Sequence, residues 1–304
     1  EVDKVYLDMF FPKNSKSFIE SMINDILNFY IIHINNVEWL SFETMSKAKL
    51  KLENMKVNVG GSYTEYKYNL SNKSTLIDNV ILMNKVISDN ELVRLKEYKI
   101  KFDFSPTVVN AYYNPLDNSI NFPAALKELY ITNDDYYAIL GSIGTIISHE
   151  ITHAFDNNGA KFDENGNRVN WWNDEDYSKF EELQKEVSEY YSNFEVIDGI
   201  YVDGEKTVGE NIADLGGFSF IVTMAREKGA NKDDMKVFFS SYASLWASEY
   251  IDSYQKLLVL SDTHSPDRIR VNAVVSSIDY FYELYKIGPN DDMYIEPNKR
   301  VKVW

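Results

Sequence analysis

The sequence predicts a mostly helical α+β fold, and three observations support this prediction. Amphipathic helical patterns fill the first hundred residues, a strand-like stretch follows, and helical patterns then return. With 304 residues, of which 44% are hydrophobic and 26% charged, the chain can form one large domain or two medium-sized ones around a sizeable core. We therefore expect a helical segment followed by an α+β domain.

The first part of the chain, residues 1–97, is expected to be helical. Apolar residues recur at three- and four-residue spacing over 17–36, and charges alternate over 41–55 in the manner of an exposed helix. A Gly-marked break is expected over 57–66, and another helix over roughly 75–97.

The second part, residues 98–304, is expected to begin with strands. A turn rich in Pro, Asp and Asn separates TVVNAYY (107–113) from INF (120–122), which is the pattern of a β-hairpin. Helical patterns then cover 134–156, 176–195, 208–228, 232–249 and 275–287. Strands followed by helices predict an α+β domain.

Charge and composition exclude several classes of protein. The net charge of −16 argues against a nucleic-acid or anionic-membrane partner. The apolar stretch 137–148 is too short to span a membrane. The chain has no cysteine, so it forms neither a disulfide nor a thiolate metal site. Any metal must be held by His, Asp or Glu.

The motif SHEITHAFDNNG, residues 148–159, points to a metal site. His149 and His153 lie one helical turn apart on one face, so both can reach one ion. Glu150 projects to one side, where it can accept a proton from a metal-bound water, as in the H-E-x-x-H zinc-peptidase signature. The alternative is two helix-surface histidines beside a common glutamate.

A catalytic zinc usually takes three protein ligands, and TVGENIADLGGFSF, residues 207–220, offers a third. Glu210 and Asp214 lie four residues apart on a predicted helix. Glu210 can bind the metal, while Asp214 reaches the free ring nitrogen of a ligating histidine. The alternative is two acidic residues that favour the dipole of a helix N-terminus, and taken alone the local sequence favours it.

Four motifs occur in one order along the chain: VVNAYYNPLDNSINFPAAL, HEITHAFDNNGAKFDENGN, GENIADLGG and DTHSPDRIR. Together with the final VW, they closely resemble the neprilysin/endothelin-converting-enzyme family of zinc endopeptidases, including its bacterial endopeptidase-O members. The resemblance is strong over 105–304 and looser before it. It implies a thermolysin-like catalytic domain of the gluzincin type over 98–304, preceded by helices from the tail of a larger helical lobe.

The resemblance also implies the composition of the metal site. His149, His153 and Glu210 would hold one Zn²⁺ per chain. Glu150 would be the general base that activates the zinc-bound water, a role worth roughly 10²–10⁴ in rate. Asp214 would be the partner of a zinc histidine, His149.

Further residues would contact the substrate. His264 matches the histidine that stabilises the oxyanion, and Arg270 the arginine that binds a substrate carbonyl. Asn110 and Ala111 match the pair that hydrogen-bonds the substrate backbone. Read locally, His264 is a turn residue, Arg270 a surface salt-bridge former and Asn110 a strand-end cap.

A pocket for the apolar residue after the scissile bond is implied in the same way. Its lining would be Leu126, Ile146, Leu245 and Trp246. The alternative is that these four are ordinary core residues. The segment after the substrate-binding strand lacks a double proline that is frequent in the family.

The resemblance implies a zinc metalloendopeptidase that hydrolyses oligopeptides on the amino side of large hydrophobic residues. Family members run to about twice this length, so we expect the missing N-terminal half as a partner, either as a separate chain or outside this sequence. The alternative is a catalytically incompetent peptide-binding or scaffold half of a two-chain assembly. Val301 stands where animal members carry a cysteine, which indicates a bacterial member, cytoplasmic or exported.

Overall fold

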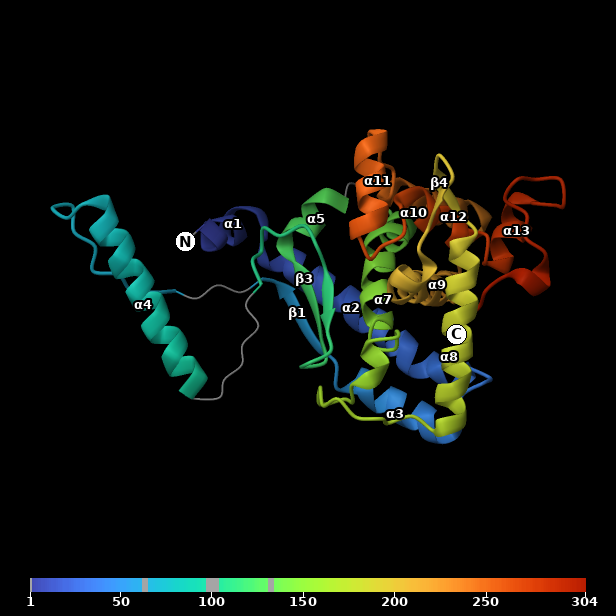
Figure 1. Cartoon of the computed structure of the whole chain (residues 1–304), viewed down its shortest axis with the longest axis horizontal. Coiled ribbons are helices and arrows are strands. Elements are labelled where there is room, and N and C mark those ends of the chain that lie inside the picture. Colours follow the sequence, from blue (N-terminus) through green and yellow to red (C-terminus); the bar gives the residue numbers. More distant parts are fainter. Residues whose placement is uncertain (1, 62–64, 97–103, 131–133) are drawn as a thin grey trace.

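The computed structural model describes residues 2–61, 65–96, 104–130 and 134–304 (Figure 1). The helices are α1 (Val2–Phe10), α2 (Lys13–His33), α3 (Phe42–Glu53), α4 (Leu76–Lys96), α5 (Ala124–Tyr130), α6 (Tyr136–Ile139), α7 (Thr145–Thr152), α8 (Asp174–Ser192), α9 (Gly204–Glu227), α10 (Lys232–Leu245), α11 (Asp252–Ser261), α12 (Asp267–Val275) and α13 (Asp279–Tyr285). The strands are β1 (Lys56–Gly60), β2 (Tyr112–Asn114), β3 (Ser119–Pro123), β4 (Glu195–Ile197) and β5 (Ile200–Tyr201). No helix within the described ranges is long and apolar enough to cross a membrane.

The mostly helical α+β prediction is confirmed. The predicted hairpin is formed by β2 and β3, which pair antiparallel with Tyr112 opposite Asn121. The long helical patterns correspond to helices with ends shifted by a few residues. Residues 97–103, where the predicted helical segment meets the predicted strands, lie outside the described residues.

The predicted break over 57–66 is wrong for residues 57–60. They belong to β1, which pairs parallel with β3, Val57 opposite Ile120. A five-residue edge strand that ends in Gly60 is too short to show a clear strand pattern in the sequence. Its partner β3 lies about sixty residues away, so the local sequence gives no sign of the pairing. The short elements α1, α11, α12, β4 and β5 were also not predicted.

The centre of the fold is formed by α7 and α9, which pack against each other, with α8 covering α9 (Figure 1). The first part of the chain joins this centre, because α2 packs against α7, α9 and β1. Side chains of both parts, such as Ile23 and Ile147, belong to one hydrophobic core. In contrast, α4 stands apart from the body and has no buried residue.

A cluster of stacked aromatic rings packs the N-terminal part of α8 against segments that are distant in the sequence. Trp172 and Phe180 stack with centroids 5.2 Å apart, and Trp39 stacks on Phe180 at 6.4 Å. Trp304 stacks on Trp39 at 5.6 Å. These contacts connect the first part of the chain with its last residue.

Candidate metal centre

One helical run presents the H-E-x-x-H residues. A single π-helical turn, Leu140–Gly144, joins α6 to α7, and such turns occur frequently at functional sites. His149 and Glu150 lie on α7, and His153 is its C-terminal cap. Gly217 of α9 makes the close approach possible, because a Cβ at this position would lie 2.8 Å from the backbone nitrogen of His149.

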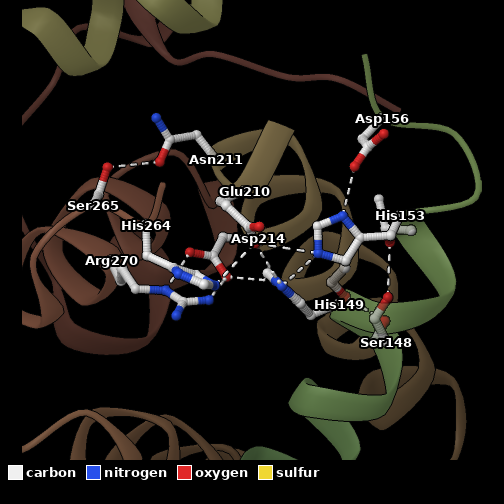
Figure 2. A network of polar contacts seen from close by, with 12 residues as sticks. Ser148, His149, His153, Asp156, Glu210, Asn211, Asp214, His264, Ser265 and Arg270 are labelled. Carbon is white, nitrogen blue, oxygen red and sulfur yellow. Dashed lines mark hydrogen bonds and ion pairs between the residues drawn. The ribbon is translucent and has the colours of Figure 1, made fainter. Parts of the chain in front are cut away.

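Three ligand atoms converge between α7 and α9. The Nε2 atoms of His149 and His153 lie 2.9 Å apart. Glu210 places Oε2 3.2 Å from each of them. The three residues together form a group able to hold one metal ion (Figure 2).

Two buried carboxylates orient the histidine rings. Asp214 Oδ1 lies 2.7 Å from His149 Nδ1, and Asp156 Oδ2 lies 2.6 Å from His153 Nδ1. Each carboxylate accepts the Nδ1–H, so each Nε2 presents a lone pair toward the other ring. Asp156 was not predicted, although its place three residues after His153 was a usable signal.

A cation fits this arrangement. Glu210 Oε2 is buried and has no hydrogen-bond partner within the described residues, and it faces two imidazole lone pairs. Without a positive charge, three acceptors would point at one another, which is unfavourable in a buried site. One carboxylate and two imidazoles form the ligand set of several catalytic zinc sites.

The electrostatics of the site also favour a bound cation. Burial opposes charge on His149 and His153, but the neighbouring carboxylates outweigh burial and raise the pKa of both imidazoles. Burial would raise the pKa of Glu210, but the interactions of its carboxylate with the neighbouring histidines, His149 first, outweigh burial and hold this pKa far below its usual range. The carboxylates therefore create a strongly negative potential where a cation would sit.

Arg270 lies behind the metal site. Its guanidinium donates from Nε to Asp214 Oδ2 and from Nη2 to Asp214 Oδ1, both at 2.7 Å, and the residue is only 5% exposed. It stacks 3.8 Å from the centre of the Trp246 ring. Burial raises the pKa of Asp214, but the charge of Arg270 outweighs burial and holds it well below its usual range.

His264 enters the site from the segment after α11. Its Nε2 lies 3.1 Å from Glu210 Oε2, and its Nδ1 lies 2.8 Å from Asp262 Oδ1. The segment is fixed to α9 because Ser265 Oγ donates to Asn211 Oδ1 at 2.7 Å (Figure 2). Asp262 was not predicted either, and its signal was a carboxylate two residues before the histidine.

Two adjoining cavities meet at the site. They share Asn110, Ala111, His149, Glu150 and His264 in their lining. The smaller, about 190 Å³, extends past Arg270 to the four predicted pocket residues: Leu126, Ile146, Leu245 and Trp246. The larger, about 410 Å³, extends past Glu210 to Lys206 and Tyr113. The structure thus brings all thirteen predicted site residues to one cleft.

Comparisons with known proteins give a consistent result. A family model described as peptidase family M13 matches residues 110–301, and a second model with the same description matches residues 1–63. Neutral endopeptidase of Lactococcus lactis subsp. lactis (strain IL1403) is 34% identical over 307 residues, 98% of this chain and 48% of that protein. Human neprilysin is 28% identical over 333 residues, 100% of this chain and 44% of that protein.

Solved structures share the fold over the whole chain. PepO from Lactobacillus rhamnosis HN001 superposes with a TM-score of 0.89 at 30% identity, covering 100% of this chain and 49% of that one. The zinc metalloprotease Zmp1 of Mycobacterium tuberculosis, in complex with an inhibitor, gives 0.88 at 31% identity, with coverage of 100% and 49%. The chain spans about half the length of the curated relatives it matches.

Proposed function

Because this chain belongs to peptidase family M13, we propose that it is the catalytic half of a zinc metalloendopeptidase. His149, His153 and Glu210 would hold the metal. The observation that carries the proposal is the buried Glu210 Oε2, which has no hydrogen bond within the described residues and faces the two Nε2 atoms. When bound, zinc supplies a Lewis acid that lowers the pKa of a water molecule to about 7 and polarises a carbonyl.

Each remaining group would act on water or substrate. Glu150 lines both cavities and would take the proton of the attacking water. His264, with its Nδ1 held by Asp262, would donate from Nε2 to the oxygen that becomes negative. Asp214 would keep the His149 ring in the orientation that directs Nε2 at the metal.

The cavities suggest how a peptide would lie. Asn110 and Ala111 precede β2 and line both cavities, so an extended peptide could hydrogen-bond there as an added strand. The smaller cavity would take the side chain after the scissile bond. Leu126 and Ile146 in its lining favour a large hydrophobic side chain. The hydrogen bonds of Arg270 within the described ranges come from Nε and Nη2, so Nη1 would bind a substrate carbonyl.

We also propose a division of the chain into two units. Because α2, α3 and β1 share the hydrophobic core of the metal centre, they would belong to the catalytic domain rather than to a helical lobe. The exposed helix α4, with no buried residue, would belong to the lobe supplied by the rest of the protein. That rest would also be the chain's partner in substrate binding.

The test is a metal analysis combined with a peptide assay. We expect one zinc per chain, and Glu150→Gln should retain zinc while losing roughly 10²–10⁴ in rate on a quenched peptide with Phe after the cleaved bond. The assay is run with and without an added N-terminal half. A Glu150→Gln variant that cleaves at the wild-type rate contradicts the mechanism. Bound zinc without turnover in either assay indicates a peptide-binding half instead.

A further inference from the structure

We propose that Lys51 is a positioning residue for the metal centre. Its terminal amino group holds the segment 154–162, and through that segment it holds Asp156 against His153. The inference rests on the proposed metal site and adds a residue from α3, outside both metal-binding motifs.

Lys51 is almost completely buried, with 1% of its surface exposed. Its Nζ donates three hydrogen bonds, to the carbonyl oxygens of Ala154 at 2.8 Å, Gly159 at 2.7 Å and Phe162 at 2.6 Å. An ammonium group has three N–H donors. All three are therefore used, and all three acceptors belong to the segment that follows His153.

Burying the Lys51 amino group at this position is energetically unfavourable, which indicates that its hydrogen bonds have a structural role. Within the described residues no carboxylate lies at ion-pair distance from Nζ, and burial lowers the pKa of the amino group. The rings of Tyr113, Phe155 and Trp171 lie around it, with centroids 5.7–5.9 Å from Nζ. Backbone carbonyls and aromatic faces thus replace water around the group.

The same segment carries the partner of a metal ligand. Asp156 Oδ2 accepts from His153 Nδ1 at 2.6 Å, and Oδ1 accepts the backbone N–H groups of Asn158 at 2.7 Å and Gly159 at 2.6 Å. Gly159 is therefore held on both sides, through its N–H by Asp156 and through its carbonyl by Lys51.

The segment has no room to adjust. A Cβ on Gly159 would lie only 1.9 Å from the carbonyl oxygen of His153, so the backbone turns back directly onto the ligand residue. A displacement of Gly159 would move Asp156, and Asp156 sets the orientation of the His153 ring. Loss of the Lys51 hydrogen bonds should therefore weaken metal binding at a distance.

Substitution of Lys51 by methionine tests this role, since Met keeps an unbranched apolar side chain of similar length and removes every donor. We expect zinc affinity, measured by competition with a chelator on folded protein, to fall about 10–100-fold, as for other residues that orient metal ligands. Leu52→Ala is the matched control, because Leu52 is the next buried residue of α3 and contributes only packing. It should lose stability but keep the wild-type zinc affinity.

The inference is overturned if Lys51→Met binds zinc as tightly as the wild type. Failure of the wild type itself to bind zinc would instead contradict the proposed function.

Amide hydrogen exchange on the zinc-free wild-type protein can still overturn the inference if Lys51→Met does not fold. If Lys51 holds the segment, the amides of Asn158, Gly159 and Ala160 are protected before zinc is added. If they exchange rapidly and become protected only with zinc, the metal orders the segment and the inference is wrong.

Discussion

Asp214 and Arg270 form a buried, two-pronged ion pair, in which Nε and Nη2 of the arginine each lie 2.7 Å from a different carboxylate oxygen. The same carboxylate accepts from His149 Nδ1 at 2.7 Å. One anion therefore orients a candidate metal ligand and a candidate substrate-binding residue. The two candidate functions would be coupled through one buried carboxylate.

Arg270→Met should destabilise the protein by about 3–5 kcal/mol, because it leaves the buried Asp214 carboxylate without its counter-charge. Urea unfolding at neutral pH measures the change. Arg268→Met is the control, since Arg268 is exposed and, among the residues that the structure describes, makes a single hydrogen bond, to the carbonyl of Glu195. Equal stability of the two variants would mean that the Asp214–Arg270 pair contributes nothing net.

Gly217→Ala should weaken zinc binding, although Gly→Ala in a helix usually stabilises by about 1 kcal/mol. The new Cβ would meet the backbone of Ser148 and His149 at 2.8–3.0 Å, so α7 and α9 must separate and His149 moves away from Glu210. Chelator competition measures the affinity.

Gly216→Ala is the neighbouring control. Its Cβ would meet the ring of Trp304 at 2.5 Å, and a side chain can shift where a helix backbone cannot. This variant should lose stability and keep its zinc affinity. The same loss of zinc affinity in both variants would show that the α7–α9 approach at Gly217 has no special role.

The sequence predicted which side chains come together at the candidate metal centre: His149 and His153 share a helix turn, Glu210 lies in a motif that resembles a family motif, and the structure places their ligand atoms side by side. The sequence did not predict every residue that holds these candidate ligands in position. The charge pattern over 41–55 suggested an exposed helix, yet Lys51 in that stretch is buried. Its burial depends on carbonyls about one hundred residues away, which no local pattern reports.

Tyr30→Phe should lower the stability of the protein by roughly 0.5–1.5 kcal/mol, the usual net contribution of a hydrogen bond, because Ser148 and Thr152 keep their bonds to the carbonyls of Gly217 and Ser148. The Tyr30 hydroxyl contacts Ser148 Oγ at 2.7 Å and Thr152 Oγ1 at 2.8 Å, so it connects α2 to α7, which carries the candidate ligand His149. Thermal unfolding and zinc affinity are measured together. Tyr190→Phe is the control, because its hydroxyl donates to Ala273 O at 2.9 Å, away from α7. Only Tyr30→Phe should lower the zinc affinity.

Asp176→Asn should lower stability at neutral pH by about 1–2 kcal/mol, and the difference from wild type should disappear in acid. Burial would raise the pKa of Asp176, but hydrogen bonds from the N–H and hydroxyl of Ser41 outweigh burial and hold it below its usual value. A depressed pKa in the folded state contributes stability above the unfolded pKa of about 3.9, and this stability is lost as the pH falls through the folded value.

Asparagine at this position imitates the protonated carboxyl, so the difference between wild type and variant should begin to shrink below about pH 4 and should vanish only below the lowered pKa of the folded state. Urea unfolding of both proteins at several pH values between neutral and acid gives the curve. A difference that stays constant with pH would show that the charge of Asp176 does not contribute.

His264→Gln distinguishes between two possible roles of His264, a metal ligand and an oxyanion donor. His264 Nε2 lies 3.1 Å from Glu210 Oε2, about as near as the Nε2 atoms of His149 and His153 at 3.2 Å, so distance alone would admit it as a further ligand. Its side chain is 40% exposed and its Nδ1 is held by Asp262, which suits a donor facing the substrate instead. As an oxyanion donor, its loss should lower kcat by about 10²–10³ and leave zinc affinity unchanged. If His264→Gln loses zinc as readily as Glu210→Gln, then His264 is a ligand, and another group must stabilise the oxyanion.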